Sequence, residues 1–142
     1  MKKKLNCILL IDDDEPTNFL NRMTLEQVGC ARQIRIVQSG QDALDFLMHQ
    51  GKYEQVQDCP HPDLIFLDIN MPAMDGWEFL EKYRQLSTTQ KASIVMIMLT
   101  TSLNPDDEQR ALSIPEINGF ENKPLKADRL KEILENYFPD RG

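Results

Sequence analysis

Acidic side chains gather at a few points of this sequence, together with hydroxyl groups and one lysine. The residues concerned are Asp12, Asp13, Asp14, Asp68, Thr100, Thr101, Ser102 and Lys123. Clustered carboxylates repel one another unless a cation or a lysine compensates them. Hard oxygen ligands in this number suit Mg²⁺, which prefers octahedral geometry, a few carboxylates and several waters. If the fold brings these side chains together, we expect a Mg²⁺ site with a lysine beside it.

Short apolar runs alternate with longer segments of helical period, and these elements must position the polar residues. The apolar runs cover residues 7–11, 34–37, 64–67, 94–99 and 117–121, and the helical segments cover 16–28, 41–50, 74–86, 105–112 and 126–137. This alternation predicts an α/β fold of five strands and five helices, with a parallel sheet covered on both faces. Ligands of such open sheets bind outside the carboxyl ends of the strands. The polar residues follow four of the predicted strands, so we expect them at one edge of the sheet.

Several residues mark where the predicted helices begin and end. Asp13 or Asp14 can cap a helix that has Pro16 in its first turn. Gly29 follows that helix, where a left-handed residue is expected. Asn104 precedes Pro105 and predicts another capped start.

Length and composition limit the class of protein. The chain has 142 residues, no repeat and no long linker, so we expect one domain. Its net charge of −7 would repel a phosphate backbone, which disfavours direct nucleic-acid binding. The basic start lacks a signal-peptide cleavage site, and no apolar run has the ~20 residues that span a bilayer. We therefore expect a soluble, cytoplasmic protein that does not bind membranes.

Four sequence runs together resemble the receiver domains of response regulators in bacterial two-component systems. These runs are Ile8-Leu9-Leu10-Ile11-Asp12-Asp13-Asp14, Leu67-Asp68-Ile69-Asn70-Met71-Pro72-Ala73-Met74-Asp75-Gly76, Leu99-Thr100 and Lys123-Pro124. The resemblance implies one stand-alone, chemotaxis-regulator-like receiver domain over residues 1–142, with a core of about 5–139. It also implies a flavodoxin-like, doubly wound sheet with strand order 2-1-3-4-5.

The same resemblance implies a metal site and a phosphoacceptor. Asp68 matches the aspartate that accepts the phosphoryl group. Asp13 matches a direct Mg²⁺ ligand, and Asp12 one that acts largely through water. Asn70 matches the position whose backbone carbonyl completes the metal shell. Such a domain is a signalling module that catalyses only its own phosphorylation and slow dephosphorylation.

The resemblance also assigns catalytic roles to Thr100 and Lys123, beside Asp68, and a switch role to Thr100 and Phe120. Thr100 resembles the hydroxyl that bonds the phosphoryl group, and Lys123 the ammonium that neutralises it. Phe120 falls where the family carries an aromatic residue that turns inward on activation. Thr101 competes with Thr100, because the spacing to Lys123 implies a one-residue insertion; we prefer Thr100 since it directly follows the apolar run.

The resemblance also implies partners, and two rival functions stay open. The phosphoryl donor would be a sensor histidine kinase or a histidine phosphotransfer protein. With no output domain expected in the chain, the output would be changed affinity for another protein or for a second copy. One rival is a Mg²⁺-dependent aspartyl-phosphate phosphatase, because Asp12-x-Asp14 resembles the haloacid-dehalogenase signature, from which Pro16 departs. The other is a degenerate receiver that only binds partners.

Two segments depart from the family pattern. Residues 113–117 replace the usual small-residue turn before the last strand, and Pro115 must end or kink the preceding helix. The loop at residues 52–62 is long, and the sequence suggests no function for it.

Overall fold

A five-stranded parallel sheet forms the centre of the protein in the computed structural model, which describes residues 3–55, 60–91, 93–101 and 104–140. All neighbouring strands are parallel, and their order is β2-β1-β3-β4-β5. The strands are β1 (Leu5–Ile11), β2 (Ala31–Val37), β3 (Leu64–Leu67), β4 (Val95–Thr100) and β5 (Gly119–Asn122). The predicted flavodoxin-like order is therefore confirmed.

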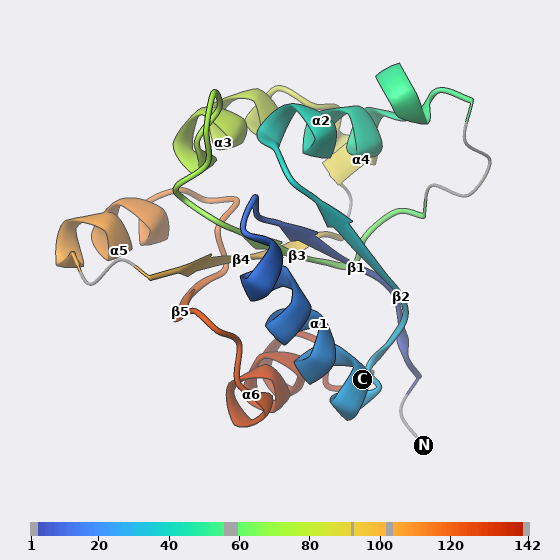
Figure 1. Cartoon of the computed structure of the whole chain (residues 1–142), viewed down its shortest axis with the longest axis vertical. Coiled ribbons are helices and arrows are strands. Elements are labelled where there is room, and N and C mark those ends of the chain that lie inside the picture. Colours follow the sequence, from blue (N-terminus) through green and yellow to red (C-terminus); the bar gives the residue numbers. More distant parts are fainter. Residues whose placement is uncertain (1–2, 56–59, 92, 102–103, 141–142) are drawn as a thin grey trace.

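Helices cover both faces of the sheet (Figure 1). On one face α1 packs against α6, and on the other α2 packs against α3, while α5 contacts β5 at the edge. The helices are α1 (Glu15–Val28), α2 (Gly40–Met48), α3 (Gly76–Arg84), α4 (Thr88–Lys91), α5 (Pro105–Leu112) and α6 (Ala127–Tyr137). None of these described helices is long and apolar enough to cross a membrane.

The expected number of five helices is wrong, because the described residues contain six. The additional helix, α4, has four residues and no buried side chain, so it leaves no apolar periodicity in the sequence. A capping box holds its start: Ser87 Oγ accepts from the Gln90 N–H at 3.1 Å, and Gln90 Oε1 accepts from the Ser87 N–H at 3.0 Å. A 3-10 turn, Gly51–Tyr53, also lies at the start of the long loop, of which residues 56–59 are outside the described part.

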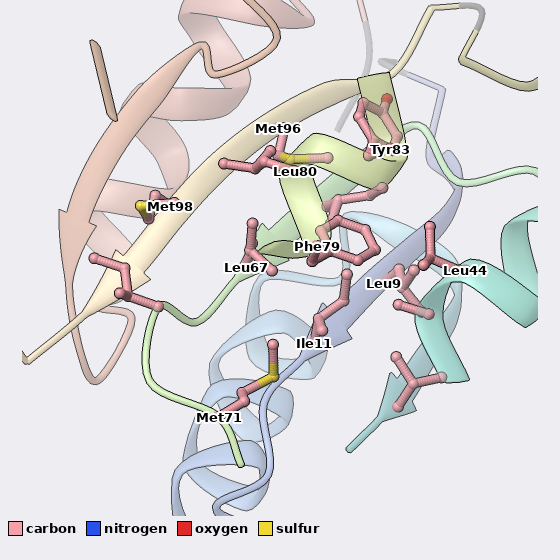
Figure 2. Close-up of a cluster of buried hydrophobic side chains, with 14 of the residues drawn as sticks. Leu9, Ile11, Leu44, Leu67, Met71, Phe79, Leu80, Tyr83, Met96 and Met98 are labelled. Carbon is pink, nitrogen blue, oxygen red and sulfur yellow. The ribbon is translucent and has the colours of Figure 1, made fainter. Parts of the chain in front are cut away.

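The core divides into two clusters, one on each face of the sheet. Alternate residues of β1 point to opposite faces, so Leu9 and Ile11 join the cluster under α2 and α3, and Ile8 and Leu10 join the other. Figure 2 shows the first cluster, in which Leu9, Ile11 and Leu67 of the sheet meet Phe79 and Leu80 of α3. Each such fully buried side chain contributes about 1.5–3 kcal/mol of hydrophobic stabilisation.

Three residues that were predicted to mark helix ends do so, whereas α3 is two residues shorter at each end than predicted. Asp14 caps α1, accepting from the Thr17 N–H at 3.1 Å, and Gly29 ends that helix with a φ of 67°. Asn104 caps α5 by accepting from the Asp106 N–H at 3.0 Å.

The segment around Pro115 joins α5 to β5, and Glu116 within it makes ion pairs with two basic residues. α5 ends at Leu112, and Glu116 lies 3.2 Å from Arg84 Nε and 3.9 Å from Lys91 Nζ. β5 begins at Gly119, two residues later than predicted, because the Asn118 side-chain Oδ1 accepts the Met96 N–H at 2.9 Å in place of a backbone carbonyl.

Candidate functional site

Backbone hydrogen bonds continue one residue beyond three strands and fix the residues that follow them. The Asp12 N–H donates to the Val37 carbonyl at 3.1 Å, and the Asp68 N–H donates to the Ile11 carbonyl at 2.9 Å. The Lys123 N–H donates to the Thr100 carbonyl at 2.9 Å. Because these bonds extend the hydrogen-bond ladder of the sheet, the backbone at Asp12, Asp68 and Lys123 is held in place. The three side chains therefore project from fixed positions at the carboxyl-terminal edge of the sheet.

Lys123 bridges two buried carboxylates at this edge. Its Nζ lies 2.8 Å from Asp12 Oδ2 and 2.9 Å from Asp68 Oδ1. The three side chains are only 8%, 6% and 4% exposed, respectively. The other Asp12 oxygen accepts the Asp14 N–H at 2.9 Å. An ammonium shared between two desolvated carboxylates is a strong, directional interaction.

The carboxylates of Asp12, Asp13 and Asp68 form one cluster. One oxygen of each lies within 4.8 Å of the other two. Asp13 is exposed, whereas Asp12 and Asp68 are buried. When all three carboxylates are ionised, Lys123 compensates one of them, so two negative charges remain. This excess, offered by oxygen ligands near solvent, fits a hydrated divalent cation such as Mg²⁺.

Burial and charge oppose each other in setting the pKa values at the site. Burial raises the pKa of Asp68 above its ordinary value; the hydrogen bond from Lys123 opposes this rise, and the charge of Asp12 adds to it. Burial alone would lower the pKa of Lys123, but its bonds to Asp12 and Asp68 outweigh that effect and raise it. Lys123 therefore stays protonated at neutral pH.

The loop that follows Asp68 folds back on the site. The Asn70 backbone N–H bonds to the Asp68 carboxylate, and the Asn70 side chain is exposed. Gly76 returns the chain to the site, donating its N–H to the Ile69 carbonyl at 2.7 Å. A Cβ on Gly76 would lie 2.6 Å from the Asp68 carbonyl oxygen, so this close approach requires glycine.

Thr100 and Phe120 lie at the same edge, on the face of the sheet that α3 covers. Phe120 pairs with Met98 across the β4–β5 ladder and packs against the cluster that contains Met98. Side chains two residues apart on a strand share a face, so Thr100 projects to that same side. Thr100 is fully buried, whereas Thr101 is exposed. Ser102 lies outside the described residues.

Sequence reasoning did not single out Asn18 and Asn21 of α1, whose side chains hydrogen-bond to the backbone at Asp12 and at Leu125, close to Lys123. Both side chains are at least 97% buried. The Asn18 Nδ2 donates to the Asp12 carbonyl at 2.8 Å, and Asn21 Oδ1 accepts the Leu125 N–H at 2.8 Å. The sequence feature that could have revealed them is their helical spacing, because Asn18 and Asn21 share one face of the helix with Leu25, which is buried.

A parallel sheet in the order β2-β1-β3-β4-β5, with a lysine between clustered aspartates at one edge, is the arrangement that the four sequence runs predicted. The chain belongs to the response regulator receiver domain family, whose model matches residues 8–135. It is 31% identical over 129 residues to the probable methanogenesis regulatory protein FilR2 of Methanothrix harundinacea, covering 90% of this chain and 78% of that protein. It is 36% identical over 100 residues to the response regulator Rcp1 of Synechocystis, covering 70% of this chain and 65% of Rcp1.

Solved structures agree with this assignment. A two-component response regulator from Cytophaga hutchinsonii superposes with a TM-score of 0.83 and 30% identity, over 96% of this chain and 99% of that one. The Mn²⁺-bound form of Rcp1 superposes with a TM-score of 0.72 and 29% identity, over 94% of each chain. Receiver domains act in two-component signalling, interact with histidine kinases and bind Mg²⁺ at an acidic cluster.

Proposed function

We propose that this receiver domain accepts a phosphoryl group on Asp68 in a Mg²⁺-dependent reaction and then changes its affinity for a protein partner. The observation that carries the proposal is the position of Lys123, whose ammonium lies within 2.9 Å of both Asp12 and Asp68. The acceptor carboxylate and a phosphorylated donor are both negative, so transfer depends on charge compensation and on alignment of the attack. Lys123 supports the first, and the extended backbone ladder supports the second.

In the proposed reaction an oxygen of Asp68 attacks the phosphorus of a phosphohistidine. The new P–O bond forms as the P–N bond breaks, and the histidine nitrogen leaves with the bonding electron pair and takes a proton from solvent. Asp68 must be ionised to attack, and the bond from Lys123 opposes the rise of its pKa that burial causes. Lys123 would then exchange its contact with the carboxylate for one with a phosphoryl oxygen.

The residues that would hold Mg²⁺ are Asp13 and Asp68 through their carboxylates, Asn70 through its backbone carbonyl, and Asp12 largely through water. When bound, the ion would supply positive charge to the phosphoryl oxygens. Asp12 suits an indirect role, because both of its oxygens already accept hydrogen bonds, from the Asp14 N–H and from Lys123. Asp13 is the exposed member of the cluster and suits direct coordination.

The proposed switch connects Thr100 to Phe120. The Thr100 hydroxyl would bond the phosphoryl group, and the half-buried Phe120 would turn inward toward the space that Thr100 leaves. Phe120 lines a groove of about 540 Å³ between α5, β5 and α6, together with Asn104, Glu108 and Lys126. Movement at Phe120 would change this groove, where we place a downstream protein or a second copy of the chain. The donor would be a sensor histidine kinase or a histidine phosphotransfer protein.

Intact-mass measurement tests the phosphoacceptor. With Mg²⁺ and acetyl phosphate, the wild-type protein should gain one phosphoryl group, and Asp68→Asn should gain none. Asp63→Asn, which changes an aspartate at the opposite end of β3, serves as the control and should label normally. Equal labelling of the wild type and Asp68→Asn would overturn the assignment.

Amide hydrogen exchange tests the switch. With Mg²⁺ and beryllofluoride, a phosphoryl mimic, protection should change between Thr100 and Lys123. It should change less in α2. This helix contacts β2, which lies at the opposite end of the strand order from β5. A change confined to the loops that contain the aspartates would mean that the site does not communicate with the Phe120 groove.

The phosphatase alternative is weaker because of Asp14. A phosphatase that used Asp12-x-Asp14 would need a free carboxylate at Asp14, whereas this carboxylate caps α1 and accepts hydrogen bonds from Thr17. Turnover of a small phosphoester such as p-nitrophenyl phosphate, lost in Asp14→Asn, would favour the phosphatase. A protein that binds partners but takes no label would favour the degenerate receiver.

A further inference from the structure

Two buried asparagines of α1 contact the backbone at two separate points of the site. Asn18 is 3% exposed and bonds to the Asp12 carbonyl, and Asn21 is 1% exposed and bonds to the Leu125 N–H. Residues three apart lie on the same face of a helix. One face of α1 therefore holds the chain just after β1 and just after Lys123.

These two points carry the partners of the central ion pair. Asp12 and Lys123 are 111 positions apart in the sequence, yet their charged groups meet at 2.8 Å. Leu125 lies two residues beyond Lys123, and its carbonyl also accepts a hydrogen bond from Thr24 Oγ1 at 3.1 Å. α1 thus holds the N–H and the carbonyl of Leu125 while it holds the carbonyl of Asp12.

Packing alone does not account for an asparagine at position 18. Its Oδ1 is buried and has no hydrogen-bond partner within the described part of the chain. A buried acceptor without a partner lowers stability, and leucine, with similar size and no such atom, would avoid that cost. The bond that Asn18 makes through Nδ2, to the Asp12 carbonyl, is what leucine could not replace.

We propose that Asn18 and Asn21 are positioning residues that set the distance between the Asp12 carboxylate and the Lys123 ammonium. Asn18 fixes the acidic partner, and Asn21 fixes the lysine. The inference rests on the proposed function, since positioning matters only if the site takes up a metal ion and a phosphoryl group. A misplacement of about 1 Å by a residue remote from the chemistry can slow a reaction on the order of 100-fold.

The two asparagines should have separable effects, measured on Asn18→Leu and Asn21→Leu. Isothermal titration with Mg²⁺ alone should give weaker binding for Asn18→Leu, because Asp12 loses its anchor. Binding by Asn21→Leu should be unchanged or tighter, because a displaced lysine no longer competes for the carboxylates. With acetyl phosphate and Mg²⁺, Asn21→Leu should label roughly tenfold more slowly than the wild type. A general loss of stability would not produce this division.

A double variant tests whether Asn21 acts through Lys123. In a Lys123→Met background, Asn21→Leu should slow labelling no further, because the group that it positions is already absent. Asn21→Asp keeps an acceptor oxygen for the Leu125 N–H and should label much faster than Asn21→Leu. If Asn21→Leu does not fold, Asn21→Asp and Asn18→Leu still decide the inference through labelling rate and Mg²⁺ affinity.

Leu25→Val is the matched control, because Leu25 is buried on the same face of α1, one turn beyond Asn21. It should lower stability but change neither Mg²⁺ affinity nor labelling. The inference is overturned if both asparagine variants behave as the wild type, if Leu25→Val weakens Mg²⁺ binding as much as Asn18→Leu does, or if Leu25→Val slows labelling as much as Asn21→Leu does. If wild type and Asp68→Asn label equally, the proposed function fails instead, and Mg²⁺ affinity still tests the positioning of Asp12.

Discussion

Replacing Lys123 with methionine removes the ammonium from the site and keeps a side chain of similar length. In the wild type this ammonium lies 2.8 Å and 2.9 Å from two carboxylates whose side chains are 6% and 4% exposed. Removing one partner of a buried ion pair costs about 3–5 kcal/mol, because the remaining charge is left uncompensated. In the absence of divalent cations, we expect the free energy of unfolding of Lys123→Met to fall by about this amount at neutral pH.

The deficit should depend on pH, with a sign that follows from Asp68. Burial already raises the pKa of Asp68, and loss of the opposing bond from Lys123 should raise it further. A carboxyl with a raised folded pKa contributes stability below its unfolded pKa, about 3.9, and this contribution is lost as the pH rises through the folded value. The difference between Lys123→Met and the wild type should therefore be small near pH 4 and full at pH 7–8.

Mg²⁺ should restore much of the lost stability. The ion would supply the positive charge that the variant lacks, and no lysine would repel it, so Lys123→Met should bind Mg²⁺ as tightly as the wild type or more tightly. A tenfold lower Kd adds about 1.4 kcal/mol of stabilisation at the same saturating concentration.

Urea unfolding at several pH values, with EDTA or with Mg²⁺, measures all of these effects. Lys131→Met, the same change at an exposed lysine of α6, is the control and should stay near the wild type throughout. If Lys123→Met is as stable as the wild type at pH 7.5 in EDTA, the reasoning from charge compensation is wrong. If Lys123→Met fails to bind Mg²⁺, Lys123 is itself required for metal binding, and the expected competition between the lysine and the ion is wrong.

Two further substitutions test the metal ligands and the loop after Asp68. Asp13→Ala should weaken Mg²⁺ binding at least about tenfold in calorimetric titration. The control is Glu15→Ala, which removes an exposed acid of α1 and should leave Mg²⁺ affinity unchanged. If both variants lose Mg²⁺ affinity equally, general surface charge and not coordination by Asp13 explains the binding. Gly76→Ala would place a Cβ 2.6 Å from the Asp68 carbonyl oxygen. It should lower the free energy of unfolding by about 1–3 kcal/mol in urea and also slow labelling by acetyl phosphate, and unchanged stability would show that the loop relaxes easily.

Much of the site was predictable because its residues follow directly from strand ends. Apolar runs with branched side chains mark the strands, and parallel strands must place their carboxyl ends at one edge. Asp12 and Asp68 each directly follow the end of a strand, and β1 and β3 are neighbours, so the strand order brings the two carboxylates together. Local rules also gave the caps at Asp14 and Asn104, since a cap depends on residues two or three positions away.

Other features were decided by contacts that local patterns do not encode. The late start of β5 depends on the Asn118 side chain, which replaces a backbone acceptor. The short helix α4 has no buried residue, so it lacks the apolar stripe by which longer helices are recognised in a sequence. Thr100 is buried and Thr101 is exposed, and the packing of β4 within the sheet decides this difference, which the apolar run alone did not show.

The sequence by itself determined which chemical groups this protein brings to one edge of its sheet, because strand and helix periodicities are local properties. The tertiary structure alone decided which atoms bond there. Lys123 meets Asp12 across 111 positions, and the asparagines of α1 reach Asp12 and Leu125 only because the helix packs beneath both strand ends. Such distances depend on the packing of all the intervening elements, so a sequence pattern can indicate the participants of the site but not its geometry.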